Sequence, residues 1–328
     1  MSMGAEILRA FFHYFTTVRF QRPPQPTPGK LGGRFVLIEQ PPTASLFTGI
    51  LTPRDSATPK PVGALWHPAP VRKTDPDLKS KKVCIAATGG AFVLGWDPQE
   101  TGGVAAEVLI SSSFGATNVL YVQYRLAGLS ARFPAALQDL TASYKYVLDL
   151  GVSHENITLV GDSAGGNHAL ALLRHLEAPE SVLPQPGCAL LFSPWVEPTV
   201  EAVQTYEQSA ASKYDVSVAP LLRWGIDAYR PDDEISEANA QPYLCPLRHP
   251  FATKTPLFIC AGGREGLLDS IASFAEAMAR VPDNRVRFHC SEHMPHDFFL
   301  TYPVLGVKDT VCGVLQDARE FWDGCLRE

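Results

Sequence analysis

The sequence predicts an α/β fold in which a mostly parallel central sheet is flanked by helices and carries a helical cap. Two observations predict it. From about residue 80 onward, short apolar runs alternate with helix-like segments, an order that is typical of parallel strands joined by crossover helices. Between Trp195 and Thr255 this alternation stops and aromatic residues accumulate without a convincing core strand, which indicates an inserted cap.

The expected strands are short and apolar. Val83–Ala87 is apolar throughout, as a strand buried on both faces of a parallel sheet should be. The full set of expected strands is Phe35–Glu39, Val62–His67, Val83–Ala87, Asn118–Gln123, Ile157–Val160, Cys188–Phe192, Leu257–Cys260 and Val286–Cys290. The helices expected in the α/β part are Gln99–Ser112, Pro134–Leu150, Ala164–Leu176, Ser270–Arg280 and Lys308–Trp322.

A length of 328 residues fits one large α/β domain with an inserted or terminal subdomain. We expect the core to comprise residues 61–195 and 255–328, and the cap to comprise residues 196–254. The N-terminal segment, residues 1–60, is expected to be part of the cap.

The segment Ala5–Phe20 is predicted to form an amphipathic helix packed on its own protein. Its apolar residues share one side at helical spacing, and they are Ile7, Leu8, Phe11, Phe12 and Phe15. Arg9, His13 and Arg19 interrupt the segment, so neither a transmembrane helix nor a signal peptide fits well. A helix lying on a membrane surface is the alternative, but we expect a cytoplasmic protein without a membrane partner.

The composition is that of a globular protein, with 45% apolar and 19% charged residues. The net charge is −6 and no basic stripe is present, so no nucleic-acid partner is expected. The seven cysteines form no CxxC pair, which argues against a disulfide framework and a zinc site. They are interpreted as buried small side chains in a reducing compartment.

The strongest local signal is the sequence Gly161-Asp-Ser163-Ala-Gly165-Gly166, between a predicted strand and a predicted helix. This is the G-x-S-x-G pattern in its required strand–turn–helix context. Glycines two positions either side of Ser163 let the tight turn form, and the helix N-terminus favours developing negative charge. Ser163 is therefore the predicted nucleophile, with an ordinary helix-capping serine as the alternative.

A nucleophilic serine needs a base, and the base needs an orienting acid. With this elbow, the chain order is serine, acid, histidine. His293 and His296 follow the last predicted strand, at the sheet edge where catalytic loops gather. Glu265 and Asp269 follow the preceding strand, and either residue could be the acid.

The oxyanion of the reaction needs backbone N–H donors. One is expected from Ala164, which follows the nucleophile. Another is expected from the glycine-rich loop Thr88–Phe92, which follows a buried strand. Glycine allows the unusual φ angles that turn successive amides inward, and a plain glycine turn is the alternative.

These motifs together resemble the hormone-sensitive-lipase-like esterases of the α/β-hydrolase superfamily, from about residue 80 to the C-terminus. The residues that carry the resemblance are the loop Thr88–Phe92 (HGGGF in the family), the stretch Tyr124–Asp139 (YRLAPE…FPAALxD), the GDSAGG elbow, Ser193-Pro194-Trp195 and Met294–Phe298. The resemblance implies an α/β-hydrolase fold. It also implies His296 rather than His293 as the base.

The family's acid lies in a DxLxD pattern, which Glu265-Gly-Leu-Leu-Asp269 matches with glutamate first. The resemblance therefore favours Glu265. Two residues depart from the family's HGGG loop, because Thr88 replaces the histidine and Ala91 the last glycine. The amides of Gly89 and Gly90 survive both changes, so an oxyanion hole of Gly89, Gly90 and Ala164 is expected. The threonine at position 88 and the glutamate at position 265 resemble the choices of fungal members of the family, some of which act in specialised metabolism.

The expected function is hydrolysis of a carboxylic ester of a small, largely apolar molecule through an acyl-enzyme, with no metal or organic cofactor. The pocket is expected to be lined by Phe92, Trp195, Tyr206 and Trp224. One alternative is an amide or thioester hydrolase, or a cyclase that releases a biosynthetic intermediate. Another is a ligand-binding homologue, against which the presence of His296 argues. The protein is expected to be a monomer or a homodimer.

Overall fold

The computed structural model describes residues 3–19, 21, 28–40, 46–129, 131–231 and 235–327. Within these residues, an eight-stranded sheet has the order β1-β2-β4-β3-β5-β6-β7-β8. The strands are β1 (Phe35–Ile38), β2 (Val62–His67), β3 (Val83–Ala87), β4 (Asn118–Gln123), β5 (Ile157–Asp162), β6 (Cys188–Phe192), β7 (Leu257–Gly262) and β8 (Val286–Ser291). β2 is antiparallel to β1 and β4, and all the other pairs are parallel. The predicted mostly parallel sheet is confirmed.

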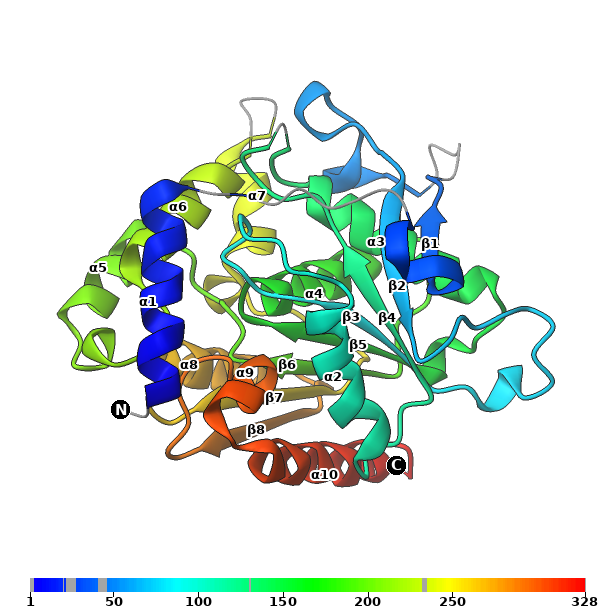
Figure 1. Ribbon diagram of the computed structural model, residues 1–328. Helices are drawn as coiled ribbons and strands as arrows, with labels where there is room; N and C mark the ends of the chain where they lie inside the picture. The colour runs from blue at the N-terminus through cyan, green and yellow to red at the C-terminus, as the bar shows by residue number, and fades with distance from the viewer. Residues whose placement is uncertain are drawn as a thin grey trace.

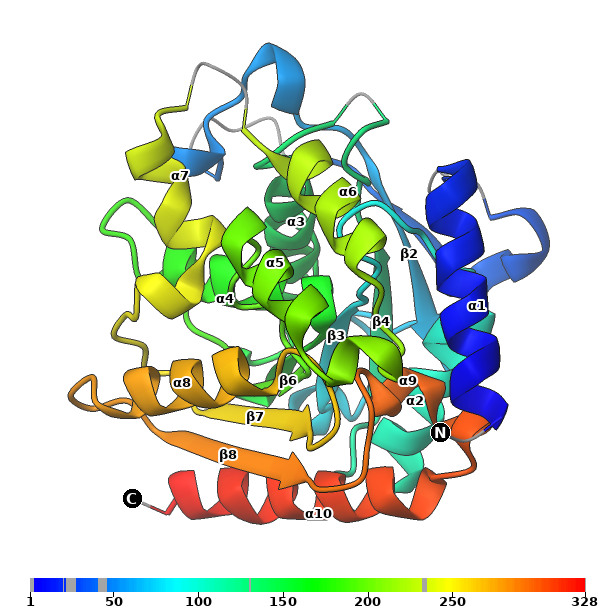
Figure 2. The same ribbon diagram turned by 90° about the vertical axis from the view of Figure 1, so that its left-hand side faces the viewer.

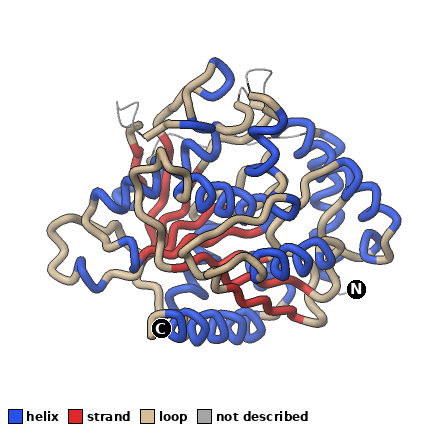
Figure 3. The backbone as a smooth tube through the Cα atoms, turned by 180° about the vertical axis from the view of Figure 1, so that it is seen from behind, coloured by secondary structure: helices blue, strands red, loops and turns tan. Residues whose placement is uncertain are grey.

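Helices cover both faces of the sheet (Figure 3). Alternate side chains of β3 show the two layers, since Val83 and Ile85 join one apolar cluster and Cys84 the other. The first cluster contains residues of α3 (Ala135–Asp149), α4 (Ser163–Leu176) and α8 (Leu268–Ala279). The second contains residues of α2 (Glu100–Ser111) and α10 (Lys308–Cys325). Each helix matches an expected one within a few residues.

The segment that interrupts the alternation is helical, with α5 (Val200–Gln208), α6 (Ala219–Tyr229) and α7 (Glu237–Leu244). It lies beyond the carboxyl ends of the central strands (Figure 2). Helix α1 (Met3–Val18) packs along α6 and against α9 (Phe298–Leu305) (Figures 1 and 2). The N-terminal helix and the inserted segment therefore lie on the same side of the core.

The side of α1 that faces the protein differs in part from the expected one. Phe12 and Phe15 pack against the core, but Ile7 and Phe11 are 58% and 41% exposed. The expected stripe is therefore wrong for Ile7 and Phe11, because α1 carries apolar residues on more than one side. In the described part of the chain, no helix is both long and apolar enough to cross a membrane.

Candidate active site

Ser163 occupies a strained turn between a strand and a helix. β5 ends at Asp162 and α4 begins at Ser163, which has a left-handed φ of 47°, a conformation that is costly for a residue with a side chain. An added Cβ at Gly161 would lie 2.5 Å from the oxygen of Gly165, and one at Gly165 would overlap the oxygen of Ala87. The two glycines thus let the turn close and hold Ser163 at the N-terminus of α4.

Three predicted side chains meet at this turn. Oγ of Ser163 lies 3.0 Å from Nε2 of His296, and Nδ1 of the same ring lies 2.6 Å from Oε2 of Glu265. The N–H of Gly262 donates to the other carboxylate oxygen of Glu265 at 2.9 Å. All three side chains are buried. Glu265 lies in the loop after β7 (residues 263–267, the acid loop), and His296 lies in the loop after β8 (residues 292–297, the base loop).

The other two candidates lie apart from this arrangement. Asp269 is exposed in the first turn of α8, and His293 is exposed in the base loop. Glu265 and His296, the residues that the family resemblance favours, are therefore the pair that the structure brings to Ser163.

The environment of His296 favours its protonated form. Burial acts to lower its pKa, but the hydrogen bond and charge of Glu265, with the charges of Asp215 and Asp162, raise the pKa above its ordinary value. An imidazole in this state takes up a proton readily and holds it beside a carboxylate, as a general base requires.

The loop Thr88–Phe92 lies beside Ser163, but one of its amides differs from expectation. The N–H of Gly89 donates to Oδ2 of Asp162 at 2.6 Å, so the expectation of a free oxyanion donor at Gly89 is wrong for this structure. A carboxylate directly before the nucleophile accepts that hydrogen bond instead. The N–H groups of Gly90 and Ala164 have no acceptor among the described residues.

The structure shows the surroundings of Thr88 and Ala91, the two residues that depart from the family loop. Oγ1 of Thr88 lies 2.9 Å from the hydroxyl of Tyr121, and the hydroxyl of Tyr124 donates to the carbonyl of Thr88. Tyr121 in β4 thus holds the side chain of Thr88, and Tyr124, just after β4, holds its backbone. Ala91 has a φ of 48°, a region that favours glycine.

A pocket opens above Ser163 and His296. Its walls include Phe12 of α1, Trp96, and Leu221 and Leu222 of α6. The rings of Phe12 and Trp96 meet edge to face with centroids 5.9 Å apart, and Nε1 of Trp96 donates to the carbonyl of Gly89 at 2.9 Å. The N-terminal helix thus contributes directly to the pocket.

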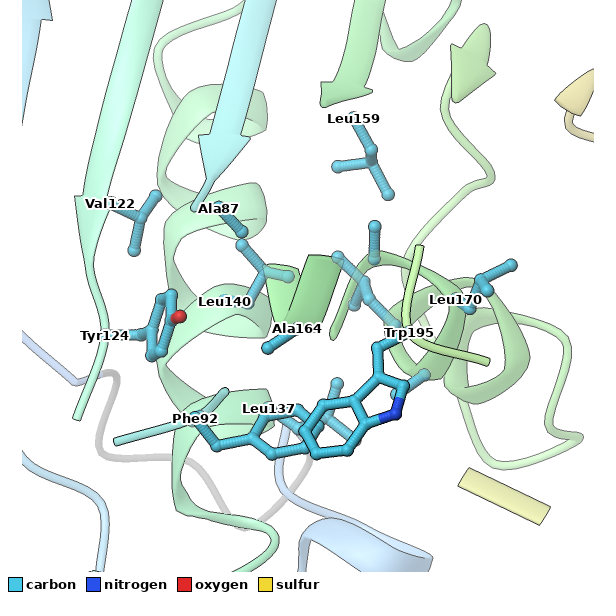
Figure 4. Packing of buried hydrophobic residues seen from close by; sticks show 14 of the residues in the cluster. Ala87, Phe92, Val122, Tyr124, Leu137, Leu140, Leu159, Ala164, Leu170 and Trp195 are labelled. Atoms are coloured by element: carbon cyan, nitrogen blue, oxygen red, sulfur yellow. The ribbon is translucent and has the colours of Figure 1, made fainter. Parts of the chain in front are cut away.

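None of the four expected pocket residues lines this pocket, and that expectation is wrong. Phe92 and Trp195 stack on each other with ring centroids 5.1 Å apart (Figure 4). Trp224 is buried in the cap, and the hydroxyl of Tyr206 donates to the carbonyl of Ser217 at 2.6 Å. These aromatic side chains pack under the pocket or inside the cap, because their large apolar surface is more stable in the core.

Three acidic residues around the site were not predicted from the sequence: the buried Asp162 and Asp215, and the partly buried Asp297. Asp162 lies inside the GDSAGG motif, so its position beside the nucleophile could have been predicted from the sequence. Asp297 follows His296 directly, and its N–H donates to Oγ of Ser193 at 3.1 Å. Asp215 lies in the cap outside any motif, and only the folded chain brings it to the base loop.

The fold and the elbow define an α/β hydrolase, and sequence comparison agrees. The model of the alpha/beta hydrolase fold family matches residues 85–300, more than half of the chain. The chain therefore belongs to this family, and the expected resemblance to hormone-sensitive-lipase-like esterases is confirmed.

Similar sequences include an acetyl-hydrolase of Streptomyces hygroscopicus, 29% identical over 238 residues that cover 70% of this chain and 72% of the relative. An esterase of Acinetobacter venetianus is 30% identical over 182 residues, covering 55% of this chain and 56% of the relative.

Similar solved structures share the fold at low identity. An esterase from the bacterial hormone-sensitive lipase family has a TM-score of 0.64 at 20% identity, covering 98% of this chain and 99% of that one. A thermostable esterase from Pseudomonas putida has a TM-score of 0.66 at 19% identity, covering 98% and 90%.

Proposed function

We propose that this chain is a carboxylesterase-like serine hydrolase in which Ser163 is the nucleophile, His296 the general base and Glu265 the orienting acid. The observation that carries the proposal is the continuous contact from the serine oxygen through both ring nitrogens to a buried carboxylate, at 3.0 and 2.6 Å. The relatives named esterase and acetyl-hydrolase support an ester as the scissile bond.

The reaction proceeds in two halves. Oγ of Ser163 attacks the ester carbonyl while Nε2 of His296 takes its proton, and the resulting tetrahedral oxyanion is stabilised by backbone amides. His296 then gives the proton to the leaving alcohol, and an acyl group remains on Ser163. Water attacks the acyl-enzyme by the same route, which releases the acid and restores the serine.

The amides of Gly90 and Ala164 are the proposed oxyanion donors. Gly90 lines the pocket together with Ser163, and Ala164 follows the nucleophile at the start of α4. Gly89 acts indirectly, because its hydrogen bond to Asp162 fixes the start of the loop. An ester that is small and largely apolar fits walls made by Phe12, Trp96 and leucines.

The test is labelling with a fluorophosphonate probe and turnover of p-nitrophenyl esters of increasing acyl length, on wild type and Ser163→Ala. We expect the wild type to be labelled and active, and the variant to lose both properties. Full turnover by the variant would overturn the mechanism. Labelling without ester turnover would favour a restricted biosynthetic substrate, and a wild type that is not labelled would favour a binding role.

A further inference from the structure

The carboxylate of Asp215 lies between the acid loop and the base loop, although Asp215 belongs to the cap segment before α6. Its Oδ1 accepts a hydrogen bond from the N–H of His296 at 3.0 Å, and its Oδ2 accepts one from the N–H of Gly266 at 2.9 Å. The residue is 0% exposed. We propose that Asp215 is a positioning residue of the cap that fixes His296 and the Glu265 loop relative to each other. The inference rests on the proposed function.

A carboxylate is the side chain that suits this place. Both of its oxygens accept backbone N–H groups, and Oδ1 also accepts the N–H of Val216 at 2.8 Å. An asparagine in the same position has one acceptor oxygen and turns an NH₂ group toward one of these donors. One buried N–H would then lose its partner, and such a loss is costly.

Helix α1 and helix α5 hold the segment around Asp215 in position. A guanidinium nitrogen of Arg9 in α1 donates to the carbonyl of Asp215 at 2.9 Å. The hydroxyl of Tyr206 in α5 donates to the carbonyl of Ser217. An added Cβ at Gly266 would overlap the Tyr206 ring, so this ring packs directly on the acid loop. The N-terminal helix and the inserted cap thus meet the catalytic loops through one short segment.

Asp215 also acts on His296 through its charge. Burial opposes protonation of the imidazole, and the charges that favour it come from Glu265 first and then from Asp215 and Asp162. Asp162 belongs to the turn that carries Ser163. A further acidic residue, Asp297, directly follows His296 in the base loop. Burial raises the pKa of Asp215 itself, while His296 and the donating amides lower it. The charges of Arg9 and Glu265 also lie near this segment.

The test compares wild type, Asp215→Asn and Asp269→Asn in the pH dependence of kcat/KM for a p-nitrophenyl ester. Rates are expressed per active site titrated with a fluorophosphonate, so that unfolded protein does not count. Asp269→Asn is the matched control, because it removes the same charge from an exposed position on α8. We expect Asp215→Asn to lose about tenfold or more of kcat/KM, since misplaced catalytic groups are costly. The fall of kcat/KM on the acid side of its pH profile, the acid limb, should move to lower pH in Asp215→Asn. The control Asp269→Asn should keep the wild-type kcat/KM and the wild-type acid limb.

An unshifted acid limb in Asp215→Asn would overturn the proposal, even if the titrated fraction falls, because a purely structural role changes only the amount of folded enzyme. If Asp215→Asn yields no titratable sites, Asp215→Glu replaces it, because that variant keeps the charge and displaces the carboxylate. Asp215→Glu should have a lower kcat/KM than the wild type, with the acid limb at the wild-type pH. A wild-type kcat/KM in Asp215→Glu would overturn the proposal. Turnover by Ser163→Ala in the same assay would overturn the proposed function and the inference together, whereas an inactive Ser163→Ala leaves the Asp215 result to decide the inference alone.

Discussion

The two ring nitrogens of His296 contact Ser163 and Glu265. The charge state of this ring decides at which pH the site can react. Only the neutral ring can accept the serine proton, so activity falls as the pH drops through the pKa of His296. Burial lowers this pKa, but the hydrogen bond and charge of Glu265, together with the charges of Asp215 and Asp162, raise it above its ordinary value of 6.5. The acid limb of kcat/KM should therefore lie above pH 6.5. In Glu265→Gln, we expect a lower kcat and an acid limb moved to lower pH. A limb that stays in place would show that Glu265 does not set this pKa.

Gly90 is a position at which a single added side-chain atom should change the rate of the reaction. Its φ is 122°, and an added Cβ would lie 2.6 Å from the carbonyl oxygen of Leu94. Gly90→Ala should therefore displace the proposed oxyanion amide and reduce kcat by about 10²–10³-fold, as loss of one such donor does. Steady-state kinetics on p-nitrophenyl acetate measures this.

The control is Gly313→Ala in α10, where an added Cβ meets no atom within 4 Å. This change should leave kcat at the wild-type value. Equal kcat in both variants would remove Gly90 from the oxyanion hole.

At the scale of elements, α1 is more than a covering helix, because Phe12 forms part of the pocket wall. Phe12→Ala should widen the pocket and raise KM for apolar esters, with a smaller change in kcat, because the catalytic groups stay in place. Ile7→Ala is the matched control, since Ile7 lies on the same helix and is 58% exposed. Equal KM values for both variants would exclude α1 from substrate binding.

At the scale of the whole molecule, one buried ion pair connects the segment before β2 to the core. Arg125 contacts Asp139 at 2.8 Å, and the Asp139 side chain is 1% exposed. The same guanidinium donates to the carbonyl of Thr58 at 2.7 Å. Arg125→Met leaves a buried carboxylate without its cation, so we expect a loss of about 3–5 kcal/mol in the free energy of unfolding.

Urea denaturation measures this loss. Lys145→Met is the matched control, because Lys145 pairs with the exposed Asp149 on the same helix as Asp139, and an exposed pair is worth about 0–1 kcal/mol. Similar losses in both variants would show that the Arg125 pair does not stabilise the fold.

Much of this architecture could be predicted because it follows local rules. The eight strands lie where the short apolar runs placed them, and the elbow at Ser163 follows from glycine spacing. Helix α9 was not predicted, because its sequence is apolar on all sides and contains Pro303, so no helical period is visible. The acid and base candidates were found from their order after β7 and β8.

The pocket and the supporting hydrogen bonds could not be predicted, because they join segments far apart in the chain. Phe12 reaches the pocket only because α1 packs along α6, and Asp215 meets His296 across 81 residues of sequence. Aromatic residues were assigned to the pocket by composition. Composition does not distinguish a ring that is buried in the core from a ring that lines the pocket. The Gly89 amide was assigned by family resemblance, and its acceptor Asp162 was overlooked.

The most direct test of the account is to find where an acyl group attaches during turnover. The enzyme is mixed rapidly with p-nitrophenyl acetate, the release of p-nitrophenol is followed, and the quenched protein is digested and analysed by mass spectrometry. We predict an acetyl group on the peptide that contains Ser163, and no adduct or turnover in Ser163→Ala. An acetyl group on a different residue that forms at the rate of turnover would contradict the account.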